Sequence, residues 1–290
     1  MKAEKKLINI GKMKQPLISV VMPVYNAGPF LAEAIESILS QTYQNFEFII
    51  IDDASIDNSL SIIRDYQKRY PEKIRIIENK SNLNCGGDKC ANKGLRIAQG
   101  KYIARMDADD IAHSERLEKQ VDFLEKNANV FLVGANAYVI DKKGNKIGEK
   151  LEPLNHRDIE KTYFTFNPLI HPACTYRRSI KNKKFLYQIK YNANNDYYTF
   201  FKLLCKGYKF ANLKEKLLYF RIHGKNDTFV NMKQKYWNTL GTRMIMMFNF
   251  GYKPTIKDLI TSFVQTIIIL LLPEKLLMNI YLFAKGIKRF

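Results

Sequence analysis

Cysteine is scarce in this chain, and its spacing matches no common metal site. The 290 residues include four cysteines, at positions 85, 90, 174 and 205, with neither a Cys-x-x-Cys pair nor histidines at zinc-finger distances. A classical zinc finger is therefore excluded. We interpret the four as reduced thiols of a cytosolic protein.

Long hydrophobic runs are missing as well. The longest uncharged apolar stretch, Leu259 to Pro273, covers 15 residues and contains four hydroxyl or amide side chains, whereas a spanning helix needs about 20 apolar residues. The start of the chain, Met1 to Lys6, lacks the apolar core of a signal peptide. We expect a cytoplasmic protein without a membrane-spanning helix.

Acidic residues are few relative to basic ones. The formal net charge is +19, of which residues 201 to 290 contribute +12, from 16 Lys and Arg against 4 Asp and Glu, and residues 1 to 200 contribute +7. Such asymmetry indicates an anionic partner, either nucleic acid or an anionic membrane surface. The simpler interpretation, an AT-rich genome that favours lysine codons, explains part of the excess.

The chain alternates between strand and helix patterns, and no Gly-, Ser- or Pro-rich tract interrupts it. This alternation predicts an α/β fold with a mostly parallel, doubly wound sheet. A hairpin turn predicted at 141–145 makes the sheet mixed. We predict strands at 17–22, 46–51, 74–77, 102–106, 130–140 and 217–222. Helices are predicted at 30–40, 116–126 and 195–206. Two further helices are predicted, one that follows an N-cap at Ser55–Asp57 and one that runs through Ala98 and is closed by Gly100.

Polar residues follow three of the predicted strands, in Pro23–Asn26, Asp52–Asp53 and Asp107–Asp110. Ligands of such sheets bind outside the carboxyl ends of the strands. We therefore expect these three segments to meet at one site.

The pair Asp107-x-Asp109 presents two carboxylates on a turn, which suits Mg²⁺ or Mn²⁺ bound together with a diphosphate and water. The ion acts as a Lewis acid and neutralises charge on a departing nucleotide diphosphate. A solvated acidic turn is the ordinary explanation of an isolated pair, but alignment with Asp52–Asp53 favours a metal site. Asp53 can accept a uracil imide N–H or a ribose hydroxyl, or it can be a helix N-cap.

Three segments occur in an order and spacing that resemble glycosyltransferase family 2: residues 18–26, residues 51–57, and Arg105-Met106-Asp107-Ala108-Asp109-Asp110. The resemblance covers roughly residues 16–225 and implies a GT-A type, Rossmann-like nucleotide-binding domain flanked by helices. It places Pro23, Tyr25 and Asp53 in the nucleoside pocket. Asp107 would face the ribose or the metal, and Asp109 the metal and the diphosphate.

The resemblance also implies an acidic general base at the start of a helix, usually in a Glu-Asp-Tyr-like motif. This sequence has Asn194-Asn195-Asp196-Tyr197, without the Glu, and we assign Asp196 as the base. Inversion by direct displacement needs such a carboxylate to take the acceptor proton; alternatively Asp196 caps its helix. Arg221 and His223 resemble the family's late Arg-x-His segment, which can approach the diphosphate.

These assignments predict an inverting glycosyltransferase that takes a nucleotide diphosphate sugar, with UDP-sugars as first candidates, and a saccharide or lipid-linked saccharide acceptor of the cell envelope. A nucleotidyltransferase is the alternative enzyme, but Val24–Gly28 lacks the basic residue of its phosphate loop. A nucleic-acid-binding module is the other alternative. No signature supports it, and the strand-end acids would repel phosphates, so we expect no nucleic-acid partner.

Residues 226–290 are predicted to form a helical, basic and apolar appendage. Apolar patches at 267–272, 276–278 and 280–283 are followed by Lys285, Lys288 and Arg289. Apolar patches flanked by cations are typical of interfacial binding to anionic lipid. We expect peripheral association with the inner face of the cell membrane; packing on the catalytic domain or on a dimer partner is the alternative.

Overall fold

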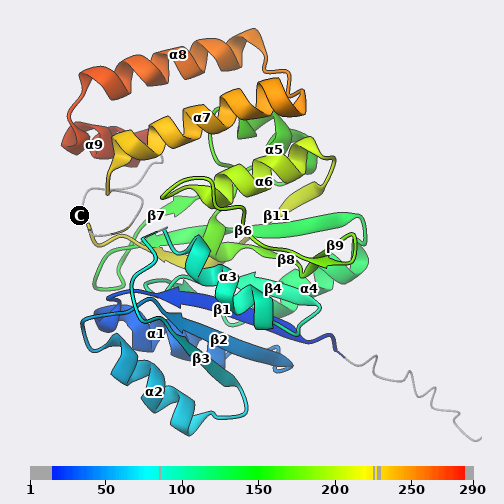
Figure 1. Ribbon diagram of the computed structural model, residues 1–290, viewed down its shortest axis with the longest axis vertical. Helices are drawn as coiled ribbons and strands as arrows, with labels where there is room; N and C mark the ends of the chain where they lie inside the picture. The colour runs from blue at the N-terminus through cyan, green and yellow to red at the C-terminus, as the bar shows by residue number, and fades with distance from the viewer. Residues whose placement is uncertain (1–14, 85, 225, 227–229, 285–290) are drawn as a thin grey trace, which may run out of the picture.

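The computed structural model describes residues 15–84, 86–224, 226 and 230–284. A nine-stranded mixed sheet lies at the centre, helices cover both of its faces, and three C-terminal helices form a further layer on one side (Figure 1). Cys85 and the cations Lys285, Lys288 and Arg289, which entered the sequence interpretation, lie outside the described residues.

The first half of the chain forms the parallel part of the sheet, as the alternation predicts. Strands β3, β2, β1 and β4 are neighbours in that order, and all three pairings are parallel. The carboxyl ends of β1, β2 and β4 therefore meet at one edge. The elements are β1 Ile18–Val24, α1 Gly28–Leu39, β2 Phe46–Asp52, α2 Ser59–Arg69, β3 Ile74–Glu78, α3 Asp88–Ile97 and β4 Tyr102–Arg105.

Two local expectations in this half differ from the structure. The N-cap position of α2 is Asn58 and not the predicted Ser55–Asp57, but the Asp57 carboxylate accepts the backbone N–H of Ser59, the first residue of α2, at 2.9 Å. The same carboxylate accepts the backbone N–H of Gly28 at 3.0 Å and stabilises the start of α1. Gly100 does not close α3, which ends at Ile97. A Cβ at Gly100 would lie 2.5 Å from the backbone nitrogen of Ser19, so this glycine permits close packing against β1.

The second half adds the antiparallel strands. Strand β8 lies between β4 and β6 and is antiparallel to both, β11 is parallel to β6, and the predicted turn at 141–145 joins β6 to β7. Strand β11 begins eight residues before the predicted 217–222, because polar residues and two register shifts between Leu213 and Leu218 obscure its alternation. The elements are β5 Ile111–Ala112, α4 Arg116–Lys126, β6 Val130–Ile140, β7 Lys146–Lys150, α5 His156–Tyr163, the 3-10 helix His171–Ala173, β8 Thr175–Arg177, β9 Ser179–Ile180, β10 Lys183–Lys184, α6 Asn195–Cys205 and β11 Lys209–Arg221.

The C-terminal layer consists of α7 Met232–Phe250, α8 Ile256–Leu271 and α9 Glu274–Ala284. Helix α7 packs on α6, and α8 lies outside α7 (Figure 1). Gly251 ends α7 in the left-handed conformation with φ 68°, and Thr255 and Asp258 form a capping box at the start of α8. Within the described part of the chain, none of the helices combines the length and the apolar character that crossing a membrane requires.

Candidate active site

The acidic loop after β4 gathers three carboxylates. One ligand oxygen from each of Asp107, Asp109 and Asp110 lies within 4.8 Å of the other two. The side chains of Asp107 and Asp109 are 33% and 27% exposed, whereas Asp110 is buried. Two of the three carboxylates are therefore accessible to a ligand from the protein surface, and the third is buried.

Asp109 is held by the segment that follows β11. Its Oδ2 lies 3.0 Å from His223 Nε2 and accepts a hydrogen bond from Asn226 Nδ2 at 3.1 Å. The His223 ring packs on Phe30 of α1, with centroids 4.8 Å apart. The contacts place His223 beside the acidic loop and involve only Oδ2 of Asp109, and the approach of His223 to a diphosphate stays a prediction.

Arg221, the last residue of β11, supports the acidic loop from below. Its guanidinium is 2% exposed, forms an ion pair with Glu33 of α1, and donates from Nε to the Asp109 carbonyl at 2.8 Å. Its backbone N–H donates to Asp110 Oδ1 at 2.8 Å. These contacts assign Arg221 a positioning role for the loop, and its direct contact with a diphosphate stays a prediction.

Asp107 pairs with Arg105, the last residue of β4. The Asp107 Oδ1 to Arg105 Nη2 distance is 2.7 Å, and the guanidinium is almost completely buried. A Cβ at Gly87 would lie 3.4 Å from the same Nη2, so the loop before α3 packs against this cation. Arg105 therefore lies between the acidic loop and the start of α3.

The donor set fits a divalent cation such as Mg²⁺ or Mn²⁺. Asp110 Oδ2 is buried and has no hydrogen-bond partner among the described residues, which is costly unless a cation or proton is nearby. Burial, followed by the charges of Asp109 and Asp107, raises the pKa of Asp110 well above its usual value. Arg105 balances only one of the three clustered carboxylates, and an oxygen-loving divalent cation would supply further positive charge.

The predicted nucleoside pocket lies at the ends of β1 and β2. Tyr25 is 51% exposed beyond β1, while Asp53 is buried and accepts hydrogen bonds from Asn79 Nδ2 at 2.6 Å and from the Leu83 backbone N–H. Pro23 lies beside Gly87, 3.8 Å from the position of a Cβ there. These residues come together as expected, and their contact with a nucleoside stays a prediction.

Asp196 occupies the first turn of α6, where the family resemblance expects the base. Its Oδ2 lies 3.8 Å from His171 Nδ1, and the side chain is 18% exposed. The His171 ring also contacts the Tyr187 hydroxyl at 2.8 Å through Nε2. Burial, followed by the charge of Arg105, lowers the pKa of His171 well below its usual value, so the imidazole is neutral.

Four residues that organise the site were not assigned from the sequence. Arg105 and Asn226 contact carboxylates of the acidic loop, Glu33 pairs with Arg221, and Asp88 contacts Asp196. Each contact except that of Arg105 joins segments more than 100 residues apart, and helix or strand periodicity carries no signal for such pairs. Arg105 adjoins the Asp107–Asp109 motif at the end of a strand predicted to be buried. A cation in a buried strand needs an anionic partner, and this signal could have identified Arg105 as the partner of Asp107.

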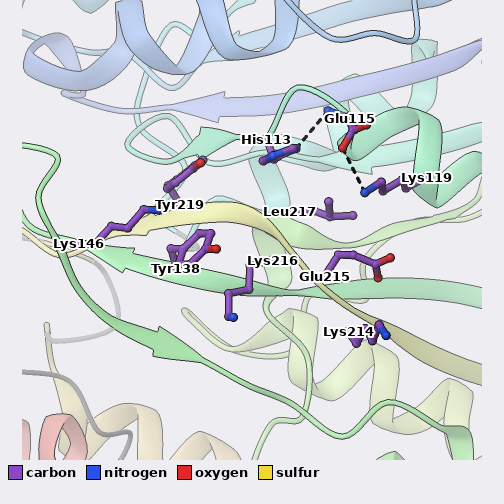
Figure 2. Close-up of a pocket in the computed structure, with 10 residues that line it drawn as sticks. All are labelled: His113, Glu115, Lys119, Tyr138, Lys146, Lys214, Glu215, Lys216, Leu217 and Tyr219. Atoms are coloured by element: carbon purple, nitrogen blue, oxygen red, sulfur yellow. Dashed lines mark hydrogen bonds and ion pairs between the residues drawn. The ribbon is translucent and has the colours of Figure 1, made fainter.

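A separate groove of about 450 Å³ lies where β5 and β11 form the edge of the sheet. Tyr138 and Tyr219 stack in it with centroids 5.4 Å apart, and the Lys146 ammonium lies 3.9 Å from the Tyr138 centroid (Figure 2). Two further lysines of the groove form ion pairs, Lys119 with Glu115 and Lys216 with Glu149. No residue assigned to the site from the sequence lines it, so we treat it as distinct from the candidate active site.

Sequence comparison connects this geometry with known proteins. Residues 19–186 match the profile of the family described as glycosyl transferase family 2. An uncharacterized glycosyltransferase of Methanocaldococcus jannaschii is 37% identical over 229 residues, 78% of each chain. A Bacillus subtilis protein named as the teichuronic acid biosynthesis glycosyltransferase TuaG is 36% identical over 117 residues, which are 40% of this chain and 45% of TuaG.

Solved structures share the fold. S. aureus TarS, residues 1–349 in complex with UDP, has a TM-score of 0.61 at 18% identity, covering 81% of this chain and 67% of that one. The mannosyltransferase PcManGT of Pyrobaculum calidifontis, in complex with GDP-Man and Mn²⁺, has a TM-score of 0.60 at 17% identity, covering 89% and 71%. The expected GT-A type fold is confirmed.

Proposed function

The chain belongs to glycosyl transferase family 2, and from that premise we propose that it is a metal-dependent, inverting enzyme that uses a nucleotide diphosphate sugar. The acceptor is a hydroxyl of a saccharide or a lipid-linked saccharide in the synthesis of a cell-envelope polysaccharide. UDP-sugars are the first donors to test, since one structural neighbour is in complex with UDP, and TuaG is named for polysaccharide synthesis. Family membership favours glycosyl transfer over the nucleotidyl transfer and nucleic-acid binding considered from the sequence.

The contact between Asp109 and His223 carries the proposal for the donor site. Asp107 and Asp109 would hold Mg²⁺ or Mn²⁺, which would supply Lewis-acid neutralisation of the departing diphosphate. With its proton on Nε2, His223 donates to the Asp109 carboxylate at 3.0 Å and fixes the orientation of that carboxylate within the acidic loop. Arg221 fixes the same loop through the Asp109 carbonyl and the Asp110 carboxylate.

Asp196 is proposed as the general base. Its side chain is partly exposed on a different element from the acidic loop, so a carboxylate is available to an acceptor without competing for the metal. The carboxylate takes the proton from the acceptor hydroxyl as the oxygen attacks the anomeric carbon. A single displacement of this kind inverts the anomeric configuration.

Within the C-terminal layer, α8 is the helix that supports a membrane partner. Met278 and Leu282 of α9, which were expected to face the membrane, pack instead against Val139 and Ile222. The one fully buried residue of α8 among those described is Ser262, whose hydroxyl accepts a hydrogen bond at 2.9 Å from buried Arg243 of α7. Gln265 accepts from the same guanidinium at 2.9 Å. The polar side of α8 therefore packs on the protein, and most of its apolar side chains face outward, while Ile268 and Ile269 are half-buried.

The outward side of α8 is long and continuous. Phe263 is 66% exposed and Leu270 60%, and further exposed apolar residues are Ile256, Leu259, Ile260, Val264, Ile267 and Leu271. Fully burying one such side chain contributes about 1.5–3 kcal/mol. Residues 201–290 also have a net charge of +12. From the exposed apolar side of α8 and this charge, we propose that α8 lies in the interface of an anionic membrane, on the cytoplasmic face of that membrane.

A donor screen tests the catalytic proposal. The purified chain is incubated with UDP-, GDP- and dTDP-sugars with Mn²⁺, with Mg²⁺ or with EDTA, and release of the nucleotide diphosphate is measured. We expect release from one donor class that EDTA abolishes. Full activity in EDTA contradicts the metal role, and a product with retained anomeric configuration by NMR contradicts the single displacement.

A further inference from the structure

We propose that Asp88 is a positioning residue that fixes the catalytic helix α6 and thereby aims Asp196 at the acceptor. The inference rests on the proposed function, because it takes Asp196 to be the base. Asp88 is the first residue of α3, 108 positions before Asp196, and only 3% of it is exposed. It has no other role in the chemistry proposed above.

The contact is of the kind that a helix cap makes. Asp88 Oδ2 accepts the backbone N–H of Asp196 at 3.0 Å. Asp196 is the second residue of α6, and the N–H groups of a first turn have no partner within their own helix. Asp88 therefore satisfies, from another helix, a donor that an N-cap side chain normally satisfies.

The residues of α6 that could do this locally are engaged elsewhere. Asn194, the N-cap, makes no capping hydrogen bond and donates instead to the Lys235 carbonyl of α7 at 3.0 Å. The Asn195 side chain accepts the N–H groups of Lys190 and Tyr191. The side chain that accepts the Asp196 N–H therefore comes from another helix, from Asp88 at the start of α3.

The loop before Asp88 links the base to the donor side. A Cβ at Gly86 would lie 3.6 Å from the Cα of Ala193, just before α6, and one at Gly87 would lie 3.4 Å from Arg105 Nη2, which pairs with Asp107. Gly87 has φ 83°, a conformation that other residues rarely adopt. The segment 86–88 therefore contacts both the acceptor-side helix and the support of the metal site, and it can hold them at a fixed separation.

The buried surroundings of the Asp88 carboxyl support this role. Its Oδ1 is buried without a hydrogen-bond partner among the described residues. Burial, followed by the charge of Asp196, raises the pKa of Asp88 well above its usual value, whereas Arg105 lowers it. A carboxyl kept in so unfavourable an environment is consistent with a functional requirement.

Four variants test the proposal: Asp88→Ala, Asp88→Asn, Asp196→Asn and the double variant Asp88→Ala/Asp196→Asn. Turnover is measured with the donor that the screen identifies, and donor affinity by calorimetry with UDP and Mn²⁺. We expect Asp88→Ala to lower kcat about 10- to 100-fold, since small displacements of a catalytic group have effects of this size, with donor affinity unchanged. Asp88→Asn, which keeps an acceptor oxygen, restores most of the activity.

The double variant distinguishes positioning from general damage. If Asp88 acts through Asp196, removing it in the Asp196→Asn background causes no further loss of kcat. An equal loss in both backgrounds, or normal turnover of Asp88→Ala, overturns the inference. Normal turnover of Asp196→Asn overturns the proposed base instead. If Asp88→Ala does not fold, it is replaced by Asp88→Ser, whose shorter side chain cannot reach the Asp196 N–H in this arrangement. The matched control is Asp158→Ala, at the start of α5.

Discussion

His223 Nε2 lies 3.0 Å from Asp109 Oδ2, although 114 residues separate them in the chain. Asp109 lies between β4 and β5, and His223 follows β11, which pairs antiparallel with β5. The loop after β4 therefore crosses β8 and β6 to reach the end of β11, where Asn226 also donates to Asp109. The two halves of the domain meet at this carboxylate, which makes it the most informative position to alter.

Replacing Asp109 with Asn should abolish transfer and remove the metal dependence of donor binding, because the amide lacks the charge that holds a divalent cation. Calorimetry with UDP in Mn²⁺ and in EDTA measures both effects. Asp122→Asn, an exposed substitution on α4, is the control and should behave as the unaltered chain. A variant that still binds UDP more tightly in Mn²⁺ than in EDTA and still responds to Mn²⁺ in turnover would place the cation elsewhere.

Replacing Asp196 with Asn should lower kcat by about 10² to 10⁴-fold, the usual contribution of a general base. Donor affinity should change little, because Asp196 lies on α6 and not in the acidic loop or the β1 and β2 ends. Steady-state kinetics over donor concentration separate kcat from KM. A rise in KM at unchanged kcat would contradict the base assignment and indicate a binding role.

The residues that the structure brings together at the expected edge of the sheet are those whose signal is local. Asp107 and Asp109 follow a short buried strand, and Asp53 follows another, so strand pattern and strand-end geometry together place them at one edge. Asp88 shows the limit of such inference. In sequence it is an acid at a helix start, as is Asp158, yet the first is buried against α6 and the second is exposed. Only the contact between the starts of α3 and α6 distinguishes them, and that contact joins distant segments of the chain.

His171 should make folding stability sensitive to mild acid. Its pKa is lowered in the folded state by burial and Arg105, so the unfolded chain binds the proton more readily. The free energy of unfolding contributed by the neutral ring is fully present above the pKa of histidine in the unfolded chain, about 6.5. As the pH falls below that pKa, this contribution is lost by up to about 1.4 kcal/mol per pH unit. The unaltered chain should therefore lose more free energy of unfolding between pH 7 and 5 than His171→Gln, whose side chain cannot take up this proton.

Urea unfolding at the two pH values measures that difference. His156→Gln, at the start of α5, is the control and should lose as much as the unaltered chain. The raised pKa of Asp88 and of Asp110 acts in the opposite direction at lower pH, but both groups are present in every variant and largely cancel in the comparison. Equal acid sensitivity of His171→Gln and the unaltered chain would show that the ring is not held neutral.

The outward side of α8 should determine membrane binding. Introducing charge with Phe263→Glu and Leu270→Glu removes apolar area and adds repulsion from anionic lipid, while Ser262 and Gln265, which anchor α8 to Arg243, are untouched. Leu151→Glu with Leu154→Glu is the matched control, since Leu151 is 58% exposed against 60% for Leu270 and lies between β7 and α5. Both double variants change the net charge equally, so a difference between them reports the position of the apolar side chains and not the total charge.

Flotation with vesicles of phosphatidylglycerol and phosphatidylcholine, compared with phosphatidylcholine alone, reads out the partition. The unaltered chain and the Leu151/Leu154 variant should float with the anionic vesicles and less so at high salt, because each cation near the surface contributes about 1 kcal/mol that ions screen. The Phe263/Leu270 variant should remain at the bottom of the gradient. If instead no variant floats but the unaltered chain sediments as a dimer that the α8 substitutions dissociate, α8 covers a second copy of the chain and the membrane proposal is wrong. Because both occupants would bury the same side chains, sedimentation and flotation have to be measured on the same preparations.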